Sequence, residues 1–203
     1  MRKELAILAA VALAVLAVIY VIGSERFKEL LGEAECPHCK PIRHRSAYRV
    51  TYEVVYFSEG REERGRAVIA VSGGRVKVVY DLAGAEVAVY LLEEGSYTCI
   101  KREGAWHCTS GKRPPVPMPL PEEVNPKSSN YLGTMEVAGE VTYCFREARS
   151  STETTVCFTG DGIPAYMESR TMRDGKLASS IALKAISIER TVSEEEFKLP
   201  VKP

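Results

Sequence analysis

The sequence predicts a mainly β protein in which an N-terminal transmembrane helix precedes a single antiparallel sheet held by hairpin disulfides. Three observations lead to this fold class. Residues 5–22 form an uncharged apolar run, residues 46–203 contain short segments of alternating polarity separated by turn residues, and two later stretches each carry a pair of cysteines. Short strands in succession, without helical periodicity between them, are typical of antiparallel sheets and not of alternating βαβ units.

The apolar run of residues 5–22 is long enough to cross a hydrocarbon layer about 30 Å thick as a helix. Arg2 and Lys3 precede it, and this basic bias keeps the N-terminus in the cytoplasm and places the rest of the chain outside it. The alternative is a cleaved secretory signal, whose apolar core spans about 7 to 15 residues and ends at small residues. Here the run is longer and ends in the bulky residues 19–22, which favours an uncleaved, single-pass anchor in the cell membrane.

The chain therefore divides into a transmembrane anchor at residues 1–23, a stalk at residues 24–45 and an extracytoplasmic β domain at residues 46–203. The last part is large enough for one hydrophobic core. Acidic and basic residues, 27 of each in the whole chain, are interspersed, which excludes nucleic acid as a partner. A chain without Gln, with two Asn and with 27% charged residues is typical of thermophiles.

The β domain begins with an alternating stretch at residues 48–57, which places its tyrosines on one face of a strand. The charged residues 58–64 are expected to form a turn. Gly73–Gly74 is a two-residue hairpin signal, and Glu103–Gly104 has the same role in a later hairpin. The other strands expected in this half cover residues 65–72, 75–82, 86–92, 97–102 and 105–110.

Six prolines within residues 112–130 exclude a central strand there, so this segment is expected to be a long surface connection within one domain. Asp174–Gly175 is a favoured hairpin dipeptide between the last two strands. Residues 177–190 also fit a helical pattern, but their Ser-Ser pair and the alternation after it favour a strand. The strands expected in this half cover residues 135–146, 152–159, 163–173 and 176–190.

Two of the three cysteine pairs fit cross-strand disulfides. With the two-residue loop after Arg102, Cys99 falls opposite Cys108 at a non-hydrogen-bonded position, where Cα atoms lie about 4.5 Å apart. This distance is within the reach of a disulfide. A turn centred on two serines places Cys144 opposite Cys157 in the same way. Neither hairpin has the short spacing of a zinc knuckle, so two structural disulfides are predicted in preference to a metal site or reduced thiols.

Cys36 and Cys39 form a C-P-H-C motif in the stalk that is open to three interpretations. The first is a structural disulfide, within the chain or between chains. The second is thiol-disulfide exchange, because thiol oxidants of the thioredoxin superfamily share this spelling, although Lys40–Pro41 stops the helix that a thioredoxin domain needs here. The third is a metal site with His38 and His44, which lacks a second knuckle. Haem attachment is excluded because residue 40 is not His.

No other constellation of residues indicates catalysis. The sequence contains no phosphate-binding or dinucleotide-binding glycine motif and no nucleophile elbow, so no cofactor is predicted and an enzyme is disfavoured. The acidic pair Glu122–Glu123 and the acidic run at residues 194–196 are expected to be solvated. His107, beside Trp106 on a hairpin, is expected to be a surface or packed side chain.

The C-terminal third carries a family resemblance. The stretch CFTGDGIPAYMESR at residues 157–170 and the ending ERTVSEEEFKLP at residues 189–200 resemble the closing strands of the lipoprotein-carrier superfamily, the LolA/RseB-like extracytoplasmic domains. The resemblance covers residues 136–200 and lies in turns and sheet packing. It implies a curved antiparallel sheet that forms a half-open barrel. The family's usual signal-peptide or lipid-anchor start and its lid helices are not evident, and no ligand-contacting residue carries over.

A curved sheet with one apolar face must cover that face or leave a cavity that suits an apolar molecule. Tyr48, Tyr52 and Tyr56 share one face of the first strand and would suit either the lining of such a cavity or a core. The sequence therefore favours a membrane-anchored, non-catalytic domain that binds a lipid, a lipoprotein or a partner protein. Two alternatives remain: thiol-disulfide exchange through Cys36 and Cys39, and a structural subunit of a membrane or envelope complex.

Overall fold

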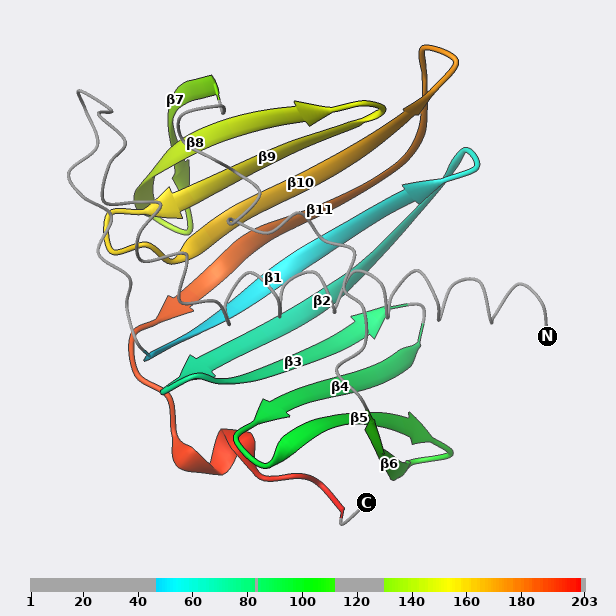
Figure 1. Cartoon of the computed structure of the whole chain (residues 1–203), viewed down its shortest axis with the longest axis vertical. Helices are drawn as coiled ribbons and strands as arrows, with labels where there is room; N and C mark the ends of the chain where they lie inside the picture. Colours follow the sequence, from blue (N-terminus) through cyan, green and yellow to red (C-terminus); the bar gives the residue numbers. More distant parts are fainter. Residues whose placement is uncertain (1–46, 83, 112–129, 202–203) are drawn as a thin grey trace.

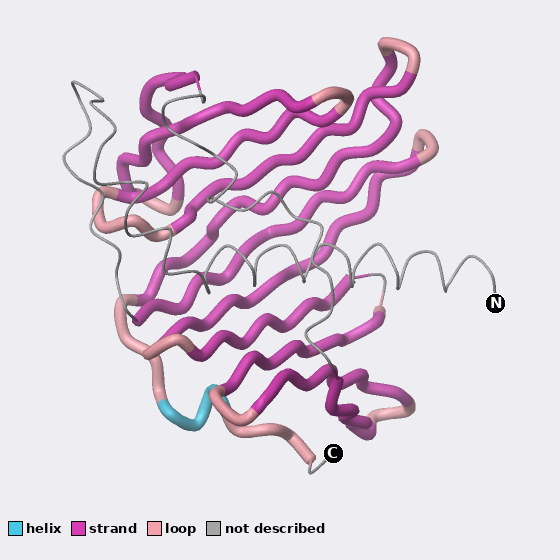
Figure 2. The backbone as a smooth tube through the Cα atoms, in the orientation of Figure 1, coloured by secondary structure: helices cyan, strands magenta, loops and turns pink. Residues whose placement is uncertain are grey.

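The computed structural model describes residues 47–82, 84–111 and 130–201. The predicted anchor, the stalk with its C-P-H-C motif and residues 112–129 of the proline-rich segment lie outside these ranges. Within them the chain is almost entirely strand, with one short turn of 3-10 helix (Figure 2). None of the helical structure in these ranges is long and apolar enough to cross a bilayer.

Eleven strands follow one another along the described chain, and two-residue turns join most of them. In order they are β1 (Ala47–Ser58), β2 (Arg61–Ser72), β3 (Arg75–Leu82), β4 (Ala85–Leu92), β5 (Gly95–Arg102), β6 (Ala105–Gly111), β7 (Asn130–Val137), β8 (Glu140–Arg149), β9 (Thr152–Thr159), β10 (Pro164–Arg173) and β11 (Lys176–Glu189), followed by the helical turn η1 (Glu194–Phe197).

All eleven strands belong to one antiparallel sheet that is not closed. Strands β1 to β6 form one meander and strands β7 to β11 form another, and within each meander consecutive strands pair with each other. The two meanders meet where β1 pairs with β11, which makes β1 the central strand of the sheet (Figure 1). The outer strands of the described sheet, β6 and β7, do not pair with each other. The predicted mainly β, antiparallel fold is confirmed.

The expected turn at residues 58–64 is wrong. Strand β1 runs to Ser58 and β2 starts at Arg61, and the turn is the pair Glu59–Gly60, both with positive φ. Such a pair makes the tight connection that matches the twist of two antiparallel strands. The charged residues that follow are mostly exposed and lie on the arm of the hairpin, where charge does not interrupt a strand.

The single strand expected at residues 135–146 is also wrong, because it is two strands. A turn at Ala138–Gly139, again with positive φ at both residues, separates β7 from β8. Alanine is not a typical turn residue, so this hairpin has little signature in the sequence. The ambiguous residues near the C-terminus are strand, as predicted, and form β11.

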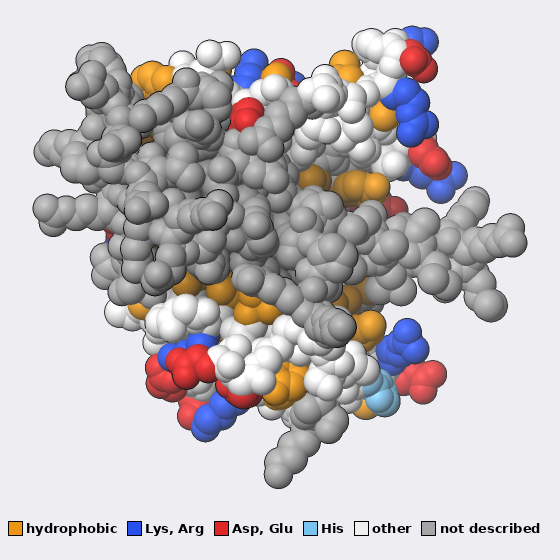
Figure 3. Space-filling view, viewed as in Figure 1, with side chains coloured by type: hydrophobic (Ala, Val, Ile, Leu, Met, Phe, Trp, Pro, Cys, Tyr) orange, Lys and Arg blue, Asp and Glu red, His pale blue; other side chains and the backbone are white. Residues whose placement is uncertain are grey.

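Alternate residues of neighbouring strands form one continuous apolar cluster, called here the apolar face. Each of its larger members is at most 5% exposed, and each contributes about 1.5–3 kcal/mol through burial. Every residue of the cluster belongs to a strand or to the turn before β10, so no second layer of the described chain contributes to it. In Figure 3, charged side chains gather toward the periphery of the view. The larger members are Tyr48, Tyr52, Ile69, Tyr80, Phe145, Phe158, Ile163, Met167 and Leu183.

The acidic run at residues 194–196 is not simply solvated, contrary to the prediction. Glu194 accepts two hydrogen bonds from the Arg75 guanidinium, at 2.6 and 2.8 Å, and Glu196 accepts one from Lys77 at 2.9 Å. Phe197 is buried, and its ring lies 4.7 Å from the Arg75 guanidinium carbon. The C-terminal segment is therefore fastened to β3, on the side of the sheet that carries Lys77 and not on the apolar face.

Candidate functional site

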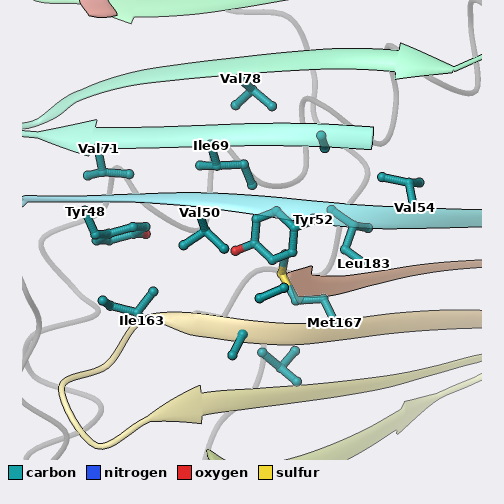
Figure 4. Close-up of a cluster of buried hydrophobic side chains, with 14 of the residues drawn as sticks. Tyr48, Val50, Tyr52, Val54, Ile69, Val71, Val78, Ile163, Met167 and Leu183 are labelled. Carbon is teal, nitrogen blue, oxygen red and sulfur yellow. The ribbon is translucent and has the colours of Figure 1, made fainter. Parts of the chain in front are cut away.

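The apolar face is the candidate site, and the tyrosines of β1 lie on it. Tyr48 and Tyr52 alternate with Val50 and Val54 along the strand and are buried, with their side chains on the same side (Figure 4). Tyr56 follows in the same alternation but is half-buried, because it approaches the exposed hairpin end. The structure thus places all three tyrosines on one face of β1, as the period of two predicts.

The hydroxyl of Tyr52 has a specific partner across the sheet. It donates a hydrogen bond to the Pro164 carbonyl oxygen at 2.6 Å, and this bond is buried. Pro164 opens β10, so the bond reaches from the central strand across β11 into the second meander. A buried polar group without such a partner costs free energy, which makes this contact a strong constraint on how the ring lies.

Tyr80 is a member of the apolar face that the sequence reading missed. It pairs with Ala67 in the register of β3 and β2, and Ala67 in turn pairs with Tyr52. The small side chain of Ala67 leaves room for the two rings on either side. Tyr80 is 1% exposed, and its hydroxyl has no hydrogen-bond partner in the described part of the chain. The alternation of Tyr80 with Val76 and Val78 was the signal that could have revealed it.

Burial keeps these phenols neutral. It raises the pKa of Tyr48 and of Tyr80 far above the ordinary value. It also raises the pKa of Tyr52, with further contributions from Tyr48 and Tyr80. The site therefore offers a wide apolar surface with a few uncharged hydroxyl groups and no charge among the members of its cluster.

Arg190 connects β8 with the turn between β9 and β10 at one end of the apolar face. Its guanidinium donates to Glu140 at the start of β8, at 2.7 Å, and to Asp161 in the turn between β9 and β10, at 2.8 Å. Thr159 also donates to Asp161, at 2.6 Å. Burial alone would raise the pKa of Asp161, but the hydrogen bonds from Arg190 and Thr159 outweigh it and lower that pKa. These contacts fix the turn that presents the Pro164 carbonyl to Tyr52.

Both predicted disulfides are present in the structure. Cys99 is bonded to Cys108 and Cys144 to Cys157, each directly opposite its partner, with Cα atoms 4.0 Å apart. Cys144 lies between two residues that point to the apolar face, and Cys99 lies in a separate small cluster around Tyr90. The register therefore places both disulfides on the side of the sheet opposite the apolar face. They hold the hairpins without lining the site.

The remaining sequence-predicted residues are not among the described residues of the apolar face. Cys36, Cys39, His38 and His44 lie outside the described residues, so their roles stay predictions. His107 is exposed on β6. Across the described ranges, no group of three or more His, Cys, Asp and Glu side chains is arranged to hold a metal ion.

No protein-family model and no curated protein matches the sequence. Among solved structures, the chain is similar to the Pseudomonas aeruginosa MucA/MucB complex, with 17% identity and a TM-score of 0.49 over 86% of this chain and 60% of that one. A structure of MucB in complex with MucA(peri) matches with 15% identity and a TM-score of 0.47, over 86% of this chain and 58% of that one. The chain thus spans less than two thirds of the MucB structures.

A LolA superfamily protein from Nitrosomonas europaea also matches, with 9% identity and a TM-score of 0.39, over 85% of this chain and 97% of that one. At these identities the likeness is one of fold alone.

Proposed function

We propose that this protein is a non-catalytic binding domain whose apolar face takes an apolar ligand, with a lipid or the acyl part of a lipoprotein as the ligand class. The observation that carries the proposal is the apolar face itself. It is continuous across both meanders, and the described chain provides no second layer for it. A single sheet with one apolar face requires a covering, and an apolar ligand can supply one.

The chemistry of the face fits a ligand of this kind. Its cluster consists of aliphatic and aromatic side chains, and the tyrosine hydroxyl groups stay uncharged because burial raises their pKa. A charged ligand would lose its hydration there without gaining a counter-charge. Tyr48 and Tyr52 at the centre of the sheet and Tyr56 toward its hairpin end are the proposed ligand-facing residues.

We further propose that the domain is anchored in the cell membrane by residues 5–22 and lies outside the cytoplasm. The support is the length of the uncharged run and the basic residues before it. Two structural disulfides agree with an oxidising compartment, although intracellular proteins of hyperthermophiles also carry disulfides. A domain held beside a bilayer would have apolar ligands within reach.

The test is lipid extraction and mass spectrometry of the full chain purified in nanodiscs of one defined synthetic lipid. An unrelated single-span protein, purified in the same way, is the control. The proposal predicts an apolar ligand of cellular origin, retained in a fixed ratio to the chain and lacking in the control. Recovery of the same cellular lipids in both samples would contradict it.

The thiol-exchange alternative rests on Cys36 and Cys39. Its test is a Cys39→Ser variant, which would trap a mixed disulfide with a substrate protein. A structural subunit would instead co-purify with partners in fixed stoichiometry. Neither alternative has support from the described part of the chain, in which all four cysteines are already paired.

A further inference from the structure

An open cleft of about 430 Å³ lies at one end of the sheet, between the β2–β3 turn, the β4–β5 turn and the end of β6. Its volume falls within the range of about 300–1,000 Å³ that is usual for small-molecule sites. None of the described residues that line it carries a charged side chain. The lining residues are Gly74, Val76, Leu91, Leu92, Gly95, Ser96 and Gly111.

The register of the sheet explains why a cleft forms there. One row of directly paired residues crosses six strands on the apolar face. From the centre outward, the side chains of this row become smaller after Leu91. Ser96 is small and Gly111 has no side chain, which leaves a depression in the surface over β5 and β6. The full row is Tyr48, Val71, Val76, Leu91, Ser96 and Gly111. The cleft is thus the outer end of the row that begins at Tyr48.

The two walls of the cleft differ in chemistry. Val76 and Leu91 give an apolar inner wall that is continuous with the apolar face. On the outer wall the Ser96 hydroxyl donates to the Gly111 carbonyl oxygen at 2.6 Å. The donor of Ser96 is therefore used, but its oxygen still has the capacity to accept a hydrogen bond. A ligand with a hydroxyl group could donate to it, whereas a carboxylate has no proton to give.

The charges around the cleft also favour some headgroups of a ligand over others. Glu93 and Glu94 are exposed in the β4–β5 turn, next to the lining residues Leu92 and Gly95. Arg75, the cation whose pKa they help to raise, already holds Glu194 by two hydrogen bonds. An anionic group in the cleft would therefore meet two carboxylates and no free cation among these residues. A cationic group would be attracted by these carboxylates, but it would lose its hydration against a lining that carries no charge of its own.

We infer that this cleft is a headgroup site for single-chain amphiphiles with an uncharged, hydroxyl-bearing head, such as monoacylglycerols. The head lies against Ser96 and Gly111, and the chain runs inward along Val76 and Leu91. This inference rests on the proposed function, since it gives one end of the apolar ligand a defined place and chemistry.

The experiment is titration calorimetry of the full chain in nanodiscs with three amphiphiles of equal chain length: monodecanoylglycerol, decanoate and decylamine. Titrations of empty nanodiscs are subtracted. Monodecanoylglycerol should bind about tenfold more tightly than the other two. Ser96→Ala should weaken the binding of monodecanoylglycerol about three- to tenfold, the worth of one hydrogen bond, and leave decanoate unchanged.

A second pair of variants tests the location of the site. A Cβ atom at Gly111 would meet nothing within 4 Å, so Gly111→Leu should fold and fill the cleft. Ser110→Leu, the neighbouring residue on the opposite face of β6, is the matched control. Gly111→Leu should abolish the preference for monodecanoylglycerol, and Ser110→Leu should retain it.

Equal affinity for the three amphiphiles, tighter binding of decylamine, or unchanged binding by Gly111→Leu would overturn the headgroup site. If the chain nevertheless retains a cellular lipid in the extraction experiment, the proposed function stands without this site. If it retains none, the proposed function fails independently of the titrations.

Discussion

Tyr52 and Tyr80 lie on either side of Ala67, but within the described ranges only Tyr52 has a partner for its hydroxyl. Tyr52→Phe would remove its bond to the Pro164 carbonyl and leave that oxygen without this donor, so the free energy of unfolding should fall by about 1–2 kcal/mol. Tyr80→Phe removes a buried hydroxyl that has no partner among the described residues, so this change should be neutral or stabilising. Urea denaturation of both variants measures the difference, and equal losses would contradict the assigned contacts.

The buried tyrosines also predict a dependence of stability on pH. Burial raises the pKa of Tyr48, Tyr52 and Tyr80 in the folded state, whereas their pKa in the unfolded chain is about 10. The unfolded state therefore releases protons first. The stability that these groups contribute is complete below about pH 10 and is lost progressively as the pH rises above it.

Denaturation at several pH values from 8 upward, followed together with tyrosinate absorbance, measures this effect. Tyr48→Phe should make the alkaline loss of stability less steep, and Tyr131→Phe, at an exposed tyrosine, should not change it. Tyrosinate from the three buried residues should appear only on unfolding. Its appearance at an ordinary pKa in the folded protein would show that the face is open to water.

At the level of elements, the disulfides hold two hairpins on the side away from the apolar face. They close loops of similar length, with sequence separations of 9 and 13. Replacing either pair by alanine should lower the free energy of unfolding by about 2–4 kcal/mol, because the unfolded chain regains conformational entropy. Ligand retention in the extraction experiment should persist. Loss of ligand without loss of stability would place a disulfide in the site.

The sequence predicted the strands best where one face is buried. In β1 the alternation of tyrosine and valine with polar residues fixed both the strand and its buried face. It failed at the start of β2, where the hairpin arm leaves the core and charged residues read as a turn. It also failed at Ala138–Gly139, because a turn that forces alanine to positive φ has no clear signature.

The candidate site could be predicted only in part from the sequence. Tyr48, Tyr52 and Tyr56 follow from one local period, and the disulfides follow from hairpin register. The cleft could not be predicted, because it depends on residues from β3 to β6 that form a row only once the register is known. The ion pairs of Glu194 and Glu196 likewise need β3 to lie next to the C-terminal segment.

At the scale of the whole molecule, the two meanders are connected by the pairing of β1 with β11, two strands that are distant in sequence. Leu183 of β11 pairs with Val54 of β1 and with Met167 of β10, and all three are buried. Leu183→Ala should lower the free energy of unfolding by about 2–5 kcal/mol through the lost burial and the cavity that remains. Ile186→Ala, at an exposed residue of the same strand, should change it by about 0.5 kcal/mol or less.

The pairing of β1 with β11 also predicts that the two meanders unfold together. Trp106, the single tryptophan of the chain, lies in β6 and reports on the first meander. Its fluorescence and the far-ultraviolet circular dichroism of the whole sheet should give coincident transitions in the wild type and in Leu183→Ala. Two separate transitions would show that each meander is stable without the other.

The most direct test of the account is photolabelling of the full chain with a long-chain diazirine, followed by peptide mapping. If the apolar face binds the ligand, adducts within the described strands should fall on residues that point to that face, with half-buried Tyr56 and Ile181 among the most accessible. A large excess of unlabelled lipid should suppress them. Adducts confined to residues of the opposite side, such as Trp106 and Val79, would contradict this assignment.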